Sequence, residues 1–189
     1  MYYHLDTDGR DNVYMEKEAR LNSHIELSMG KMWDVVEDEI DLPYRFTMIP
    51  TTDVREGDPP KLYAWYPGSD LMQERFVEVL RQAGVDNLQT FPTEVRREDT
   101  NEVVPGYVVV NIVGRVSCAK MDESDKDHVL GNAYYFHDLV IDPKQTGDLL
   151  MFRLHESPMV VLVHENVARA IEAGNFLGLT LEPLAEAVS

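Results

Sequence analysis

The sequence predicts an α+β protein built on a mixed, largely antiparallel sheet with a few short helices. Short apolar runs separated by turn residues outnumber the segments with helical spacing, which is typical of a sheet-dominated fold. The most regular run, residues 107–116, is nearly continuous in valine and isoleucine. We therefore expect it to be a central strand that is covered on both faces.

The other expected strands are short and are separated by turn-forming residues. They are residues 2–5, 24–29, 44–49, 62–65, 134–142, 149–154 and 159–163. Pro43 and Pro50 bound the strand at 44–49, and the polar residues 51–60 after it are expected to form a loop. Residues 93–102 are charged and predict a surface turn or hairpin.

One amphipathic helix is expected after Gly68. Ser69 or Asp70 can cap its first turn, which would contain Gln73 and Glu74, and Gly84 is expected to end it. Its apolar residues fall on one helical face, and they are Met72, Phe76, Val79, Leu80 and Ala83.

A second strand, helix and strand follow the same pattern near the C-terminus. The helix is expected at 165–173, and Gly174 is expected to end it. Ala173-Gly174 lies 90 residues after Ala83-Gly84 at the end of the first helix, and Pro183 lies 91 residues after Pro92. Either chance or an internal duplication explains the similarity. A duplication predicts two similar lobes about a pseudo-twofold axis.

A length of 189 residues suits one domain with a sizeable core, or two small lobes at most. We expect a single domain over 1–189, with 1–105 and 106–189 as the possible lobes.

The excess of acidic residues indicates which classes of partner the protein can bind. The chain has 34 acidic and 17 basic residues and a formal net charge of -17. Such a field repels nucleic acid and anionic membranes and attracts basic partners, although an acidic surface can also serve solubility alone. We expect no nucleic acid and no membrane as partner.

Cysteine usage and hydropathy indicate a cytoplasmic protein. Cys118 is the only cysteine, which fits a reducing compartment, and no apolar run approaches the ~18 residues of a membrane span. The first residues lack the basic and apolar regions of a secretory signal.

No catalytic, cofactor or metal signature is present in the sequence, so we expect no cofactor, no bound metal and no enzyme activity. The six histidines have no metal-ligand spacing, Cys118 ends an apolar strand without an activating neighbour, and the glycines are scattered singly. An enzyme would need side chains that converge only in the fold. The residues considered for this alternative are His137, Asp138, His155 and Glu165.

An acidic segment is the best candidate for partner binding. Five carboxylates within eight residues surround Trp33, Val35, Val36 and Ile40, and an apolar anchor with an acidic rim can steer and hold a basic partner. The alternative is a half-buried turn with a solvated face. The candidate contact residues are Trp33, Asp34, Glu37, Asp38, Glu39 and Asp41.

The C-terminal part, residues 107–184, resembles the bacterial toxin-immunity family numbered eleven. The resemblance rests on an ordered series of motifs. They are Val109-Val110-Asn111, the acidic stretch 122–127, the strand 139–143 ending in Asp-Pro, Phe152-Arg153-Leu154, the helix reaching Ala173-Gly174, and the strand with Pro183. It implies a binding protein that neutralises a cognate secreted toxin. A toxin adaptor or chaperone is the alternative binding function.

Overall fold

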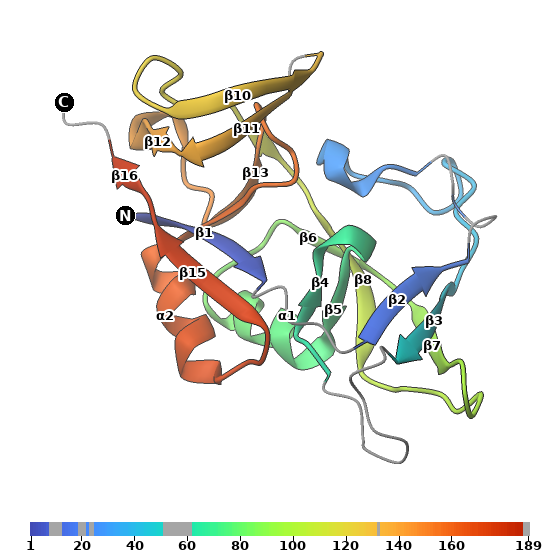
Figure 1. Ribbon diagram of the computed structural model, residues 1–189. Helices are drawn as coiled ribbons and strands as arrows, with labels where there is room; N and C mark the ends of the chain where they lie inside the picture. The colour runs from blue at the N-terminus through green and yellow to red at the C-terminus, as the bar shows by residue number, and fades with distance from the viewer. Residues whose placement is uncertain (8–12, 19–21, 23–24, 51–61, 132, 187–189) are drawn as a thin grey trace.

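The computed structural model describes residues 1–7, 13–18, 22, 25–50, 62–131 and 133–186, and its fold is α+β (Figure 1). The described residues form five β-sheets, two α-helices and three 3-10 helices. Most neighbouring strands are antiparallel, as the sequence predicts.

The largest sheet joins the N-terminal strand to strands from the C-terminal third of the chain. Its order is β15 (Leu179–Pro183), β1 (Tyr2–Thr7), β14 (Val161–His164), β13 (Met151–Leu154) and β9 (Arg115–Val116). Both of its faces are covered, because side chains that alternate along β14 enter two different apolar clusters. This explains why β14 is apolar at consecutive positions.

The second sheet contains the strand expected to be central. Its order is β4 (Trp65–Tyr66), β5 (Leu71–Gln73), β8 (Tyr107–Ile112) and β6 (Leu88–Phe91). Val109 and Val110 of β8 point to opposite faces and are at most 1% exposed, which confirms a strand covered on both sides. The strand ends at Ile112 rather than at residue 116. Gly114, with φ +108°, turns the chain there, and β9 joins the largest sheet instead.

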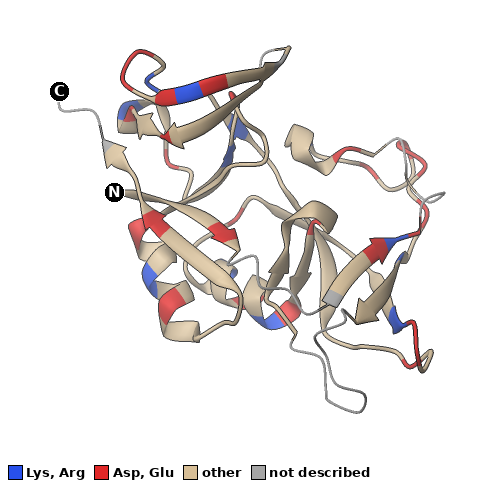
Figure 2. Cartoon of the chain, viewed as in Figure 1, with Lys and Arg blue, Asp and Glu red and all other residues tan. Residues whose placement is uncertain are grey.

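Three smaller sheets and three 3-10 helices complete the described structure. The sheets are β2 (Val13–Lys17) with β3 (Tyr44–Pro50) and β7 (Thr93–Arg97), the hairpin β10 (Asp125–Leu130) with β11 (Ala133–Asp138), and the parallel pair β12 (Val140–Ile141) with β16 (Ala185–Glu186). The 3-10 helices are η1 (Leu27–Met29), η2 (Pro67–Ser69) and η3 (Pro143–Gln145). Acidic residues occur along β10 and in the loop after η1 (Figure 2).

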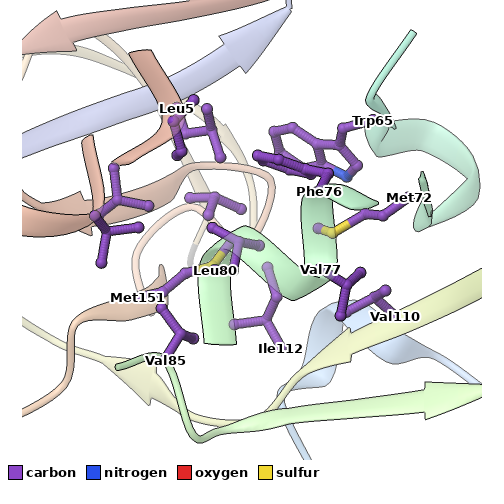
Figure 3. Packing of buried hydrophobic residues seen from close by; sticks show 14 of the residues in the cluster. Leu5, Trp65, Met72, Phe76, Val77, Leu80, Val85, Val110, Ile112 and Met151 are labelled. Atoms are coloured by element: carbon purple, nitrogen blue, oxygen red, sulfur yellow. The ribbon is translucent and has the colours of Figure 1, made fainter. Parts of the chain in front are cut away.

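Two helices pack against each other beside the two largest sheets. They are α1 (Glu74–Gln82) and α2 (Glu165–Gly174). Phe76, Val77 and Leu80 of α1 are at most 2% exposed and enter the core between these sheets (Figure 3). Val110 and Met151 bring both sheets into the same cluster.

The two helices belong to units of identical topology. In the first unit β8 lies between β5 and β6, and in the second β1 lies between β14 and β15, with the inserted strand antiparallel to both neighbours. Glu74 and Glu165, which begin the helices, are 91 positions apart, as are Gly84 and Asn175. The expected repetition of strand, helix and strand is therefore present. A common origin of the two units stays a prediction, as does the division into lobes.

Gly84, with φ +97°, ends α1 as expected, but the start of α1 and the end of α2 differ from the expected positions. Asp70 does not cap α1: it ends η2 with φ +51°, β5 intervenes, and the helix starts at Glu74. Met72, which was assigned to the helix, lies on β5. Gly174 does not stop α2 either, because it is the last helical residue and Asn175 takes the left-handed conformation at φ +49°. A side chain at 174 would collide with the Phe176 ring.

The strand expected at 24–29 is wrong where the structure describes it. Leu27–Met29 form η1, and Gly30 follows with φ +63°. Ile25 and Leu27 are both buried, so the alternating pattern correctly indicated which side chains point inward. Residues 24 and 51–60 of the expected elements lie outside the described part.

The strand expected at 134–142 is divided between two sheets. β11 ends at Asp138, and β12 then pairs with β16. Residues 93–102 combine β7 with a turn that returns to a bridge between Arg96 and Val103, so the expected hairpin is present.

A buried ion pair joins the sheets. The Arg153 side chain on β13 is 2% exposed, and its Nη2 lies 2.5 Å from Asp70 Oδ1 beside β5. Burial raises the pKa of the Asp70 carboxyl, while the nearby charges of Arg153 and Lys17 lower it. Arg153 Nη1 also donates to the Pro158 carbonyl at 3.0 Å. Removing either charge leaves its partner largely buried and without a salt bridge, and for Asp70 only the charge of Lys17 remains nearby.

Arg153→Met is expected to destabilise the fold by about 3 kcal/mol at pH 7, because the Asp70 carboxylate loses its counterion. Without Arg153 the pKa of Asp70 rises further above its unfolded value. The folded state then takes up a proton that the unfolded chain does not, and the loss should shrink as the pH falls towards 5. Urea unfolding at both pH values measures this. Arg97→Met, which breaks the exposed pair with Asp99, should leave the midpoint nearly unchanged. Equal effects of the two variants would contradict the prediction.

Candidate partner-binding surface

The acidic segment expected to bind a partner is an ordered loop, called here the acidic loop (residues 31–41). Asp34 Oδ1 accepts hydrogen bonds from the backbone N–H groups of Val36 and Glu37, both at 2.8 Å. Asp38 Oδ2 accepts from the N–H of Asp34 at 2.7 Å. Two of the five carboxylates therefore shape the turn.

The remaining carboxylates point into solvent together with apolar side chains. Glu37, Glu39 and Asp41 are exposed, and their carboxylates make no hydrogen bond or ion pair with described residues. Val35 is 40% exposed and Val36 is 82% exposed. The exposed side of the loop thus combines negative charge with apolar contact area. The acidic residues of this segment are red in Figure 2.

Trp33 and Ile40 point the other way and attach the loop to the core. Ile40 is buried in the cluster that also contains Phe46, and the half-buried Trp33 packs against that cluster. Lys31 Nζ lies 4.2 Å from the Trp33 ring centroid and 3.2 Å from Asp38 Oδ1. Trp33 therefore supports the loop, and the exposed valines form its apolar surface.

Side-chain amides fix both ends of the loop. Gln89 of β6 accepts from the backbone N–H of Trp33 at 3.1 Å and donates to the Trp33 carbonyl. Asn22 does the same for Asp41, accepting from its N–H at 2.7 Å and donating to its carbonyl at 2.8 Å. Asn111 of β8, fully buried, donates to the carbonyl of Lys31 at 2.7 Å and to Gln89 Oε1 at 3.0 Å. Hydrogen bonds from the fold itself therefore attach the loop at both ends.

Comparison with known families identifies the chain. The sequence model of the immunity protein family Imm11 matches residues 7–186. The chain belongs to the Imm11 immunity protein family. The match confirms the resemblance seen in the C-terminal part and extends it over the acidic loop. A search of curated proteins finds no match.

The residues considered for an enzyme do not converge in this Imm11 protein. His137 and Asp138 are exposed on β11, and His137 Nε2 lies 2.9 Å from Asp127 Oδ2 on the neighbouring strand. That hydrogen bond raises the pKa of His137. Glu165 begins α2, where it pairs with Arg169, and His155 is exposed after β13. A hollow of about 550 Å³ beside β2, β3 and β7 contains none of these four side chains.

Cys118 is part of the core. Its side chain is 3% exposed, and burial raises the pKa of the thiol to about 12, with a smaller contribution from Glu156 and Asp142. The thiol is therefore neutral at physiological pH, and a neutral thiol is a poor nucleophile. Among the described residues, no group of three His, Cys, Asp or Glu side chains could hold a metal ion. No helix in the described ranges is long and apolar enough to cross a membrane.

Gln89→Ala is expected to loosen the acidic loop while keeping the fold. It removes two hydrogen bonds to Trp33 and one acceptor for Asn111, each contributing about 1 kcal/mol. Amide hydrogen exchange over residues 31–41 should become faster, whereas exchange in β8 should change little. Gln82→Ala, an exposed glutamine at the end of α1, provides the control. Unchanged exchange in the loop would show that Gln89 does not hold it.

Proposed function

We propose that this protein is an immunity protein that binds a cognate secreted antibacterial toxin and neutralises it in the cytoplasm. Membership of the Imm11 immunity family carries the proposal, because that family is defined by immunity. Neutralisation by binding needs a recognition surface and no catalytic group. The preformed acidic loop supplies such a surface.

The charge of the protein favours a toxin with a basic contact surface. A net charge of -17 accelerates the encounter with a positively charged partner and repels other acidic proteins. The acidic loop contains five carboxylates and one lysine, and that lysine already forms an ion pair with Asp38. Lys or Arg side chains on the toxin would complement the unpaired carboxylates.

The order of the loop supports tight binding. Immobilising a flexible segment on binding costs affinity, and a loop that the fold has already fixed avoids most of that cost. In our proposal Glu37, Glu39 and Asp41 contact the toxin, together with Val35 and Val36. Trp33, Asp34 and Asp38 act mainly by holding these side chains in place.

Co-expression tests the function directly. We expect the toxin encoded beside this protein to kill cells when expressed alone, to spare them when the two proteins are expressed together, and to copurify with this chain. A toxin that is inert without this chain would instead identify an adaptor or chaperone. A toxin that kills equally in both conditions would contradict the proposal.

Charge reversal tests the contact surface. The double variant Glu37→Lys and Glu39→Lys is expected to slow association with the toxin by about tenfold or more and to weaken its salt dependence, because both carboxylates face solvent near the proposed contact. Glu78→Lys with Glu172→Lys is the matched control: it changes the net charge equally, at exposed positions on α1 and α2. Stopped-flow association rates at two salt concentrations compare the variants. Equal slowing by both would assign the effect to net charge and remove the loop from the contact.

A further inference from the structure

The hairpin β10–β11 carries a second exposed surface with an aromatic side chain and carboxylates. Asp127 lies opposite Tyr135 in the register, and His137 is two residues further along the same strand. The Tyr135 and His137 rings meet edge to face with centroids 5.0 Å apart, and His137 is hydrogen-bonded to Asp127. These three side chains form one connected patch, called here the hairpin patch.

The hairpin patch is not needed to hold the hairpin on the protein. Phe136, on the opposite face of β11, packs against the cluster beneath, and Lys126 donates to the carbonyls of Met121 and Ser124. Tyr135, by contrast, is 60% exposed, and Val129 near the hairpin tip is 64% exposed. An ordered but exposed tyrosine is a residue type that often dominates binding energy at protein interfaces.

Contacts between side chains and backbone connect the hairpin to the acidic loop. Gly30, next to that loop, accepts a hydrogen bond from the N–H of Gly114 at 2.8 Å. Arg115, the next residue, contacts Met29 Sδ at 3.7 Å and donates to the His155 carbonyl at 2.7 Å.

From there the path reaches the hairpin directly. The N–H of Tyr134 on β11 donates to the Glu156 carbonyl at 2.9 Å, and the Glu156 carboxylate accepts from the Ser117 hydroxyl. Residues that contact one another therefore lead from η1, beside the acidic loop, through Arg115 and the 155–156 turn to the hairpin.

We infer that the toxin contacts both the acidic loop and the hairpin patch, with Arg115 and the 155–156 turn between them. The inference rests on the proposed function. Residues 125–138 contain three carboxylates and one lysine, so the hairpin has the same sign of charge as the loop. The fitting partner is a protein that presents two separate groups of Lys or Arg side chains, one for the acidic loop and one for the hairpin.

The size of a stable interface also calls for a second contact region. Each partner in a standard complex contributes roughly 20 to 30 residues. The acidic loop is shorter than that, and Trp33 and Ile40 point inward. In this inference the hairpin patch supplies part of the additional contacts.

Tyr135→Ala tests the inference, with Tyr14→Ala as the matched control. Both tyrosines are on strands and both are 60% exposed, but Tyr14 lies on β2. We expect Tyr135→Ala to weaken toxin binding by about tenfold or more, mainly through faster dissociation, and Tyr14→Ala to change it less than twofold. Surface plasmon resonance gives both rates, and circular dichroism melting confirms that each variant is folded.

A charge variant provides an independent readout. Asp125→Lys with Asp127→Lys should slow association, and its effect should add to that of the acidic-loop variant, because separate sites contribute independently. If wild type binds the toxin and the acidic-loop variant weakens binding while both hairpin variants bind normally, the hairpin inference is wrong and the proposed function stands. If wild type neither binds nor protects, the proposed function itself fails.

Discussion

The arrangement of the sheets depends on one buried charge, the Arg153 guanidinium. Arg153 extends from the five-stranded sheet to Asp70, and the Asp70 carbonyl accepts from the N–H of Val110 in the four-stranded sheet at 2.8 Å. Ser69 beside it donates to the carbonyl of Met15 in the three-stranded sheet at 3.1 Å. Residues 69–70 thus contact three sheets. The left-handed conformation of Asp70 orients its side chain and its backbone in these different directions.

Polar groups also determine the conformation of the acidic loop, as Arg153 and Asp70 determine how the apolar sheets are arranged. The apolar cluster beneath it fixes the inward side chains, but apolar packing is not directional and would allow the loop backbone several paths. The paired hydrogen bonds from Gln89 and Asn22 select one of them. A flexible acidic tail would attract a basic partner as strongly at long range, but it would lose more entropy on binding.

Hydrophobic patterning predicted the parts of the fold in which a strand or helix has its own periodic signal. The run in β8 indicated a strand buried on both faces, and the spacing of Phe76 and Leu80 indicated one face of a helix. The pattern failed at the boundaries of elements. Met72, for example, is buried and apolar, and such a residue fits the inward face of a strand as well as that of a helix. The pattern also failed at 27–29, where a buried alternation is compatible with a 3-10 turn.

The candidate site was only partly visible in the sequence, for a different reason. The carboxylates of the acidic loop are consecutive and therefore recognisable, but Gln89 and Asn111 lie 56 and 80 positions from the backbone groups they hold. The hairpin patch was missed because His137 pairs across the strands with Asp127 and not with its neighbour Asp138. Such partners are set by strand register. Under the proposed function, the separation between supporting and contact side chains in the acidic loop has an evolutionary consequence. The side chains of Val36 and Glu37 are exposed, so substitutions there could follow changes in a toxin at little cost in stability.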